Sequence, residues 1–272
     1  TLEAVIDADL PYVLVGGWAI AAFNQRFTTD VDVVILAQAV DDYTDFLTDH
    51  GYEKTADVER NELYKGRTIR FTKDIGNPVQ FDAMVDALGC RQTEAEWSYR
   101  YLAQHSVTEE LRTGRPVTAR IPERELLFAV KLHSGRKADS RDLVVLAAGA
   151  DFDRIATHLH RGESEKLAGR IETVLNRLTS EDFADAFKGV FEPNRIPDVF
   201  RKSDSTALIE VVSLDFSRFL IAAVGEKLGV VVDRLCRNDD VDVRGEALVE
   251  RRDRPPTDEH VRQISINDGL QG

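Results

Sequence analysis

The feature that most constrains this chain is a short apolar run that ends in two glycines and continues as a helix. Residues 12–15 (YVLV) have the pattern of a buried strand, Gly16 and Gly17 follow, and residues 18–23 (WAIAAF) are helix-forming. The first N–H groups of a helix have no partner within it, and the helix dipole favours negative charge at that end. The two glycines therefore predict a point where an anion can approach the backbone closely.

Two aspartates begin the next apolar run. Residues 28–36 (TTDVDVVIL) have the pattern of a second strand, and its two-residue period places Asp30 and Asp32 on the same face at the strand's start. Twelve residues separate Gly17 from Asp30, which is enough for a helix that returns the chain to pair this strand with the first. The two carboxylates are thus expected near the glycine turn.

A third aspartate, Asp82, lies inside a later predicted strand, residues 79–86 (VQFDAMVD). Carboxylates that converge from neighbouring strands repel one another unless a cation lies among them. Mg²⁺ prefers oxygen ligands, and it can bridge carboxylates to nucleotide phosphates. The three aspartates together predict a Mg²⁺ site beside the glycines.

The rest of the first part of the chain alternates helix and strand. A helix is expected from Val40 to His50, ended by Gly51, and a further strand over residues 62–73 (ELYKGRTIRFTK). The turn signal Gly-Asn-Pro at 76–78 separates this strand from the one that carries Asp82. After residue 90 the strand signal nearly stops, apart from residues 116–121.

From residue 122 onward the pattern is helical. Helices are predicted over residues 125–132, 143–148, 151–161, 164–179, 181–191 and 205–229, and residues 250–272 are expected to form a loose tail. We therefore predict the α+β class, with a mixed β-sheet head flanked by helices and followed by a mainly α-helical body. The predicted divisions are 1–115 for the head, 116–192 for a helical module that completes the active-site cleft, and 193–272 for a C-terminal segment.

Composition excludes several classes of protein. No uncharged apolar stretch approaches 18 residues, and the N-terminal residues lack the pattern of a signal peptide, so we expect a cytoplasmic protein that does not enter a membrane. The net charge of −13 argues against wrapping of nucleic acid by bulk electrostatics. Asp outnumbers Glu and Arg outnumbers Lys, which is typical of a salt-adapted, halophilic surface.

The motifs VGGWAI, TTDVDVVI and VQFDAMVD resemble those of the nucleotidyltransferase superfamily that includes DNA polymerase beta. The resemblance covers residues 10–90. Within the superfamily, the sequence is most similar to the branch of minimal nucleotidyltransferases and AbiEii-like toxins. The segment IPERELLFAVKLHSGRKADSRDLVVL resembles the helical module of that branch. One position departs from the pattern, because Trp18 stands where the serine of the commoner Gly-Ser turn would contact a phosphate.

The resemblance implies transfer of a nucleoside monophosphate from an NTP to an acceptor hydroxyl, with release of pyrophosphate. Asp30 and Asp32 would hold two Mg²⁺ ions, and Asp82 would ligate one of them and help to deprotonate the acceptor. Asp86, four residues along the same face, is the alternative to Asp82. We favour Asp82 because apolar residues surround it, whereas Asp86 opens a loop.

The resemblance also implies a binding site for the NTP. Gly16 and Gly17 would cradle the triphosphate, and Lys131 is the first candidate for a cation on the β- and γ-phosphates, with Arg26 or Arg136 as alternatives. An ordinary lysine at the end of a helix is the competing interpretation of Lys131.

The acceptor is the open part of this interpretation. The first hypothesis is an RNA or protein acceptor, with the chain acting as the toxin of a toxin–antitoxin pair and an antitoxin protein as its partner. The alternatives are a small-molecule, aminoglycoside-like nucleotidyltransferase and a module that binds a nucleotide or a partner without turnover.

Overall fold

The computed structural model describes residues 2–24, 28–59, 65–112, 115–147 and 149–178. The chain divides into two units, Thr1–Val231 and Val232–Gly272, and all described residues belong to the first. The helices predicted at 181–191 and 205–229, the tail at 250–272 and the segment 193–272 lie outside the described residues.

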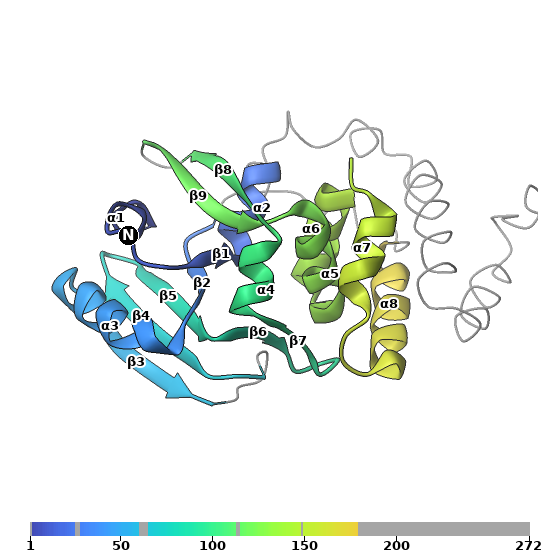
Figure 1. The fold of residues 1–272 in the computed structure, drawn as a ribbon, viewed down its shortest axis with the longest axis horizontal. Coiled ribbons are helices and arrows are strands. Elements are labelled where there is room, and N and C mark those ends of the chain that lie inside the picture. Colours follow the sequence, from blue (N-terminus) through green and yellow to red (C-terminus); the bar gives the residue numbers. More distant parts are fainter. Residues whose placement is uncertain (1, 25–27, 60–64, 113–114, 148, 179–272) are drawn as a thin grey trace, which may run out of the picture. The chain divides into compact units, whose positions relative to one another are not determined.

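Five strands form the main sheet, in the order β1-β2-β5-β4-β3 (Figure 1). They are β1 (Val13–Val15), β2 (Val31–Ile35), β3 (Glu53–Val58), β4 (Thr68–Asp74) and β5 (Pro78–Val85). β2 and β5 run parallel, and the other neighbouring pairs are antiparallel. The predicted α+β class and mixed sheet are confirmed.

The first strand passes directly into α2 (Gly16–Phe23), as the glycine pattern predicts. The chain then returns as β2, which pairs with β1 so that Val13 lies opposite Val34 and Val15 opposite Asp32. Val13 and Val34 are fully buried, and they share one apolar core with Met84 of β5. β2 is buried on both faces, since Val33 and Ile35 are fully buried as well, and Val34 lies on the same face as Asp32.

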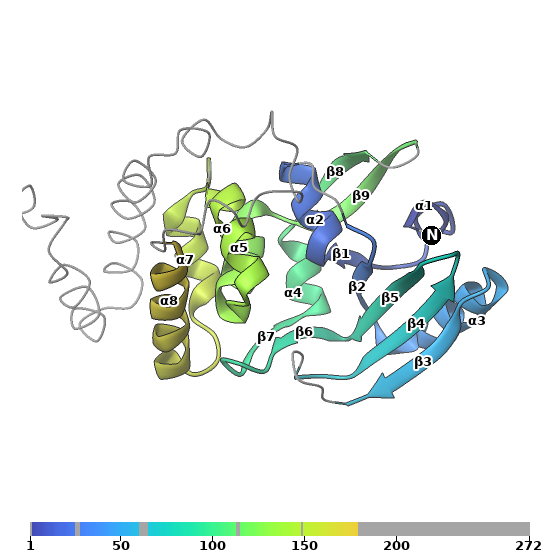
Figure 2. The ribbon, with the colours of Figure 1, turned by 180° about the vertical axis from the view of Figure 1, so that it is seen from behind.

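The sequence predicted the elements of the other half of the sheet, except for β3. The predicted strands around 62–73 and 79–86 are β4 and β5, joined by a turn in which Gly76 adopts a φ of +98°. The predicted helix is α3 (Val40–Asp49), which Figure 2 shows beside β3 and β4. Its Tyr43 ring lies 6.0 Å from that of Phe81. Strand β3 was not expected, because its mostly exposed residues at the sheet edge show no apolar alternation.

The expectation that strands nearly stop after residue 90 is wrong. Two hairpins follow the sheet, and they are formed by β6 (Ala87–Cys90) with β7 (Ala95–Ser98) and by β8 (Ser106–Arg112) with β9 (Pro116–Pro122). Only β9 was predicted. β7 has four residues, and β8 carries two adjacent glutamates, so neither has a recognisable apolar run. Each is stabilised by pairing with its partner strand, and the β8–β9 hairpin also packs on β1 and α2.

The helices predicted after residue 122 are confirmed as far as the described residues extend. Figures 1 and 2 show them grouped together on the far side of the β6–β7 hairpin from β3. They are α5 (Arg124–Ser134), α6 (Lys137–Ala147), α7 (Phe152–Leu159) and α8 (Ser164–Leu178), and two short helices, α1 (Leu2–Asp7) and α4 (Tyr99–Gln104), precede them. α6 begins six residues earlier than predicted, because its first turns are held by ion pairs of charged residues instead of by apolar contacts.

The helices share their core with the sheet. Leu126 of α5 belongs to the same buried cluster as Val13 of β1 and Trp97 of β7. The division predicted near residue 115 lies in the turn of the β8–β9 hairpin, and it stays a prediction. Within the described ranges, no helix is both long and apolar enough to cross a membrane.

Candidate active site

Asp32 and Asp82 lie directly opposite one another on two parallel strands. The register of β2 and β5 pairs Asp32 with Asp82, and neighbouring strands are about 4.8 Å apart. Asp30 precedes the first residue of β2 and is exposed, and its charge acts on Asp32. The structure therefore brings two of the three predicted carboxylates side by side on the sheet and places the third at the adjoining strand start.

Gly16, the first residue of α2, lies against the Asp32 carboxylate. Its φ is +64°, in the left-handed region, and a Cβ at this position would lie 2.0 Å from Oδ2 of Asp32. A Cβ on Gly17 would lie 2.4 Å from Oγ1 of Thr28. Only glycine allows the start of α2 to approach the Asp32 carboxylate this closely. The N–H groups of the first helical turn, which have no partner within the helix, therefore lie near the Asp32 carboxylate.

The surroundings of Asp32 disfavour its ionised form. Burial, with the neighbouring Asp82 carboxylate, raises the pKa of Asp32 to about 6, and the charges of Lys131 and Arg136 act in the opposite direction. A divalent cation between the two carboxylates would relieve the repulsion. The donor set consists of carboxylate oxygens, which Mg²⁺ prefers, so the residues present fit the predicted ion.

Arg70 of β4 holds Asp82 from its other side. Its Nε and one terminal nitrogen donate to the two oxygens of Asp82, both at 2.7 Å, and Asp82 is buried while Arg70 is half-exposed. The pair follows from the antiparallel register of β4 and β5, which sets Arg70 opposite Asp82. Sequence reasoning did not identify Arg70, because the sequence of each strand by itself does not reveal which residues of the two strands lie opposite one another.

Asp86 has a different role from Asp82. It is exposed, has a φ of +63°, and accepts a hydrogen bond from the backbone N–H of Ala37 at 2.8 Å. Its backbone N–H donates to Ile35, and its carbonyl accepts from Tyr99. These bonds make Asp86 a turn residue after β5 and favour Asp82 as the third carboxylate.

Lys131 is buried in a cluster of opposite charges. Its Nζ lies 2.8 Å from Oδ1 of Asp139 and 2.8 Å from Oδ2 of Asp142, and all three side chains are buried. Burial alone would lower the pKa of Lys131, but the two carboxylates outweigh burial and raise the pKa above its ordinary value. Lys131 is thus a permanent cation whose charge acts on Asp32, and the Asp139 and Asp142 carboxylates of α6 balance that charge.

Arg136 and Arg26 complete the predicted cations. Arg136 is half-exposed and donates to Oδ2 of Asp139 at 2.8 Å. Burial would raise the pKa of Asp139, but Lys131 and Arg136 hold the pKa well below its ordinary range. Arg26 lies outside the described residues.

A small pocket of about 50 Å³ lies next to Gly16. Its wall combines apolar residues with two cationic residues and a serine. The residues that line it are Val15, Gly16, Leu88, Gly89, Cys90, Trp97, Leu127, Val130, Lys131, Ser134 and Arg136. An anion at the start of α2 would therefore have the helix N-terminus on one side and two cationic residues close by.

A second polar cluster, formed by His105, Glu123 and His158, was not predicted. His105 follows α4, Glu123 precedes α5 and His158 lies in α7, so no spacing motif marks them.

Among solved proteins, the chain has structural neighbours of low similarity. No protein-family model and no curated protein matches the chain. A solution structure of the antibiotic-resistance factor ANT(2'')-Ia is 18% identical with a TM-score of 0.40, covering 58% of this chain and 84% of that one. A crystal structure of ANT(2")-Ia in complex with adenylyl-2"-tobramycin is 17% identical with a TM-score of 0.41, covering 58% and 90%. Similarity at this level establishes neither a shared fold nor a shared function.

Proposed function

We propose that this chain is a metal-dependent nucleotidyltransferase that moves a nucleoside monophosphate from an NTP to an acceptor hydroxyl. The observation that carries the proposal is the register of Asp32 and Asp82 on parallel strands, with Gly16 at the start of α2 against the Asp32 carboxylate. This arrangement sets a dication site beside a helix N-terminus that favours an anion, and a metal–triphosphate complex needs both.

The predicted carboxylates and glycines have places in this proposal. Asp30, Asp32 and Asp82 would hold two Mg²⁺ ions, and the backbone of Gly16 and Gly17 would meet the triphosphate. Bound Mg²⁺ would supply charge stabilisation at the α-phosphate and lower the pKa of the acceptor hydroxyl.

The reaction breaks one bond and forms one. The acceptor oxygen gives up its proton to a carboxylate, for which Asp82 is the candidate, and bonds to the α-phosphorus, while the bond from the α-phosphorus to the bridging oxygen breaks and pyrophosphate leaves. Arg70 orients Asp82 through its two hydrogen bonds. The charges of Lys131 and Arg136 act on Asp32, and both residues line the pocket next to Gly16, with Asp139 and Asp142 as their carboxylate partners.

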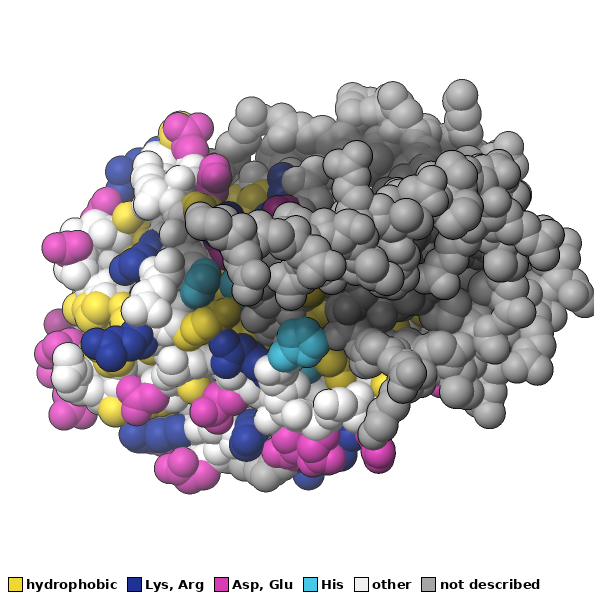
Figure 3. All heavy atoms as spheres, turned by 45° about the vertical axis from the view of Figure 1, so that its right-hand side comes forward, with side chains coloured by type: hydrophobic (Ala, Val, Ile, Leu, Met, Phe, Trp, Pro, Cys, Tyr) yellow, Lys and Arg dark blue, Asp and Glu magenta, His cyan; other side chains and the backbone are white. Residues whose placement is uncertain are grey.

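We place small molecules first among the acceptor classes. The chain carries a net charge of −13, and on the described part of the face in Figure 3 basic and acidic side chains are interspersed, with no single-sign basic patch. An RNA backbone is repelled by this charge, whereas a small hydroxyl compound that carries amino groups is attracted. The RNA or protein acceptor, the antitoxin partner, the AbiEii-like branch and the salt-adapted surface stay predictions.

One observation favours a second candidate, a nucleotide-binding module without turnover. Each oxygen of Asp82 accepts a hydrogen bond from Arg70 at 2.7 Å, so each keeps one lone pair for a metal, and Arg70 competes with the ion for this carboxylate. Such a module would bind Mg²⁺-NTP through Asp32 and the start of α2 and release no pyrophosphate.

The test is incubation of the full chain with each α-³²P-labelled NTP and Mg²⁺, in parallel with polyhydroxylated amines, cellular RNA and cellular protein. The proposal expects label on the small-molecule arm, loss of label in EDTA, and loss in Asp32→Asn. Label on RNA or protein would overturn the acceptor class alone. Binding of Mg²⁺-NTP without pyrophosphate release in any arm would favour the module, and absence of binding would overturn the site.

A further inference from the structure

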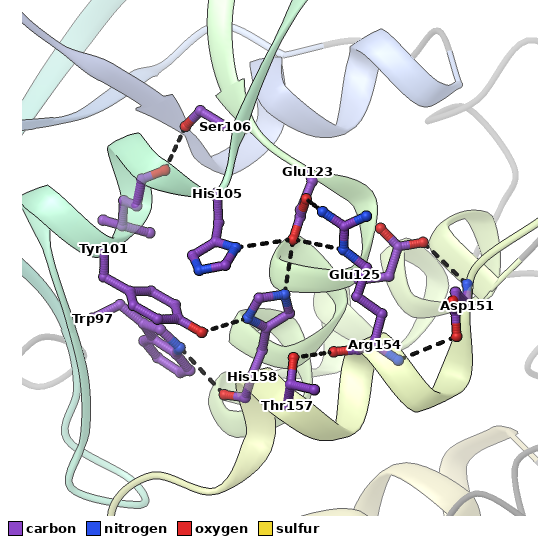
Figure 4. A network of polar contacts seen from close by, with 11 residues as sticks. Trp97, Tyr101, His105, Ser106, Glu123, Glu125, Asp151, Arg154, Thr157 and His158 are labelled. Carbon is purple, nitrogen blue, oxygen red and sulfur yellow. Dashed lines mark hydrogen bonds and ion pairs between the residues drawn. The ribbon is translucent and has the colours of Figure 1, made fainter.

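The cluster of His105, Glu123 and His158 shares no residue with the proposed nucleotide site. One imidazole nitrogen from each histidine and one carboxylate oxygen all lie within 4.8 Å of one another. His158 Nε2 lies 2.9 Å from Oε1 of Glu123, and His105 Nδ1 lies 3.4 Å from the same oxygen (Figure 4). Donors around a tetrahedral zinc ion are about 3.3 Å apart, so two of the three spacings already match.

The three donors come from separate parts of the fold. His105 follows α4, Glu123 is the residue before α5, and His158 lies in the last turn of α7. The backbone N–H of Glu123 donates to the carbonyl of His105 at 2.9 Å, so two of the donors are held together by the main chain. A pre-formed set of this kind needs little reorganisation to receive an ion.

The surroundings of His158 match those of a metal-binding histidine. Its Nδ1 lies 2.7 Å from the Tyr101 hydroxyl, while its Nε2 faces Glu123, as Figure 4 shows. A metal-binding histidine commonly donates its second ring N–H to an oxygen partner, which fixes the ring orientation and the tautomer. The side chains of His158 and Glu123 are 1% and 8% exposed, and that of His105 is 35% exposed, so the cluster opens to solvent on the His105 side.

The guanidinium of Arg154 now balances the charge of Glu123, as a bound metal ion would. Its Nε donates to Oε1 of Glu123 at 3.1 Å, and one terminal nitrogen pairs with Oε2. Its side chain is 54% exposed, so it can turn into solvent without desolvation cost when a dication takes its position. Arg154 is thus both the present counter-charge of Glu123 and the competitor of a metal.

We propose that His105, Glu123 and His158 form a binding site for a transition-metal dication of the zinc type. Two imidazoles and one carboxylate are the donor set of three-ligand zinc sites, which keep a fourth position open for water or another ligand. Imidazole donors select zinc-type ions over Mg²⁺, so the site takes a different ion from the carboxylates of the sheet. Occupancy would link the end of α4, the start of α5 and the last turn of α7.

The experiment is a calorimetric titration of the full chain, stripped with EDTA and dialysed, with ZnCl₂ in millimolar Mg²⁺, which keeps the sheet carboxylates occupied by the harder ion. We expect one zinc per chain with a dissociation constant in the micromolar range or below. Both His158→Gln and the more exposed His105→Gln should lose this binding. The matched control His160→Gln changes an exposed histidine two residues from His158 and should retain it.

Two further variants separate a metal site from a self-sufficient hydrogen-bond network. Arg154→Gln removes the competing cation and should tighten zinc binding about tenfold, and Tyr101→Phe should weaken it about tenfold. Circular dichroism on every variant confirms that it is folded. Stoichiometric zinc binding that is equal in the His105, His158 and His160 variants would overturn the proposal. Absence of zinc binding in both the wild-type chain and Arg154→Gln would overturn it as well.

Discussion

Replacing Asp32 with asparagine should stabilise the metal-free protein. Burial and the Asp82 carboxylate raise the pKa of Asp32 from 3.8 to about 6, so the folded protein holds this proton more tightly than the unfolded chain does. The free energy of unfolding therefore falls as the pH rises from about 4 to about 6, and it stays reduced above that range. Asparagine has nearly the same shape and no charge to repel Asp82.

The magnitude follows from the pKa difference. At about 1.4 kcal/mol for each pKa unit, a carboxyl raised from 3.8 to about 6 costs the ionised folded state about 3 kcal/mol. Asp32 keeps some contact with solvent, so we expect a gain of about 1 to 3 kcal/mol in Asp32→Asn at pH 7.5. For a domain of this size the melting temperature would rise by about 3 to 9 °C.

The assay is urea denaturation of the wild-type chain and Asp32→Asn at pH 7.5 and pH 4, with EDTA in one series and Mg²⁺ in the other. The variant should be more stable at pH 7.5 in EDTA and nearly equal to the wild type at pH 4. Mg²⁺ should stabilise only the wild type. A variant that is less stable than the wild type in EDTA at pH 7.5 would show that the Asp32 charge is a structural partner, and the reasoning would fail.

Three other predictions follow from the site. Lys131→Met should lower the free energy of unfolding by about 3 to 5 kcal/mol in urea denaturation, because it leaves buried carboxylates without their cation; a neutral effect would contradict the ion cluster. Gly16→Ala should cost more stability than Gly149→Ala, since both positions have positive φ but only Gly16 faces a carboxylate; equal melting temperatures would contradict the close approach. Asp82→Asn should abolish pyrophosphate release while Asp86→Asn retains it, and the reverse result would exchange their roles.

The central part of the fold was predictable because its signals are local. The apolar run before Gly16, the glycine turn and the two-residue spacing of Asp30 and Asp32 predict β1, α2 and β2 without any information on distant contacts. Asp82 was correctly placed inside a strand for the same reason. The pairing that sets Asp32 opposite Asp82 could only be inferred from the resemblance of the motifs.

The parts that sequence analysis missed depend on contacts between distant residues. β8 is charged and half-exposed, and it is a strand because β9 pairs with it. Arg70 meets Asp82 through the register of two strands, and Lys131 is buried because α6 brings Asp139 to it. The resemblance implied a phosphate ligand, and the helix-end position implied an ordinary lysine at the C-terminal dipole; neither interpretation includes the carboxylate partners of Lys131.

The central claim is that the edge formed by Asp32, Asp82 and Gly16 binds a metal–triphosphate complex. Its most direct test is anomalous diffraction from crystals of the full chain grown with Mn²⁺ and a non-hydrolysable NTP analogue. The proposal predicts a Mn²⁺ peak between the carboxylates of Asp32 and Asp82, with Arg70 moved from at least one Asp82 oxygen and the triphosphate at the first turn of α2. A nucleotide bound elsewhere, or no Mn²⁺ peak at the two carboxylates, would contradict it.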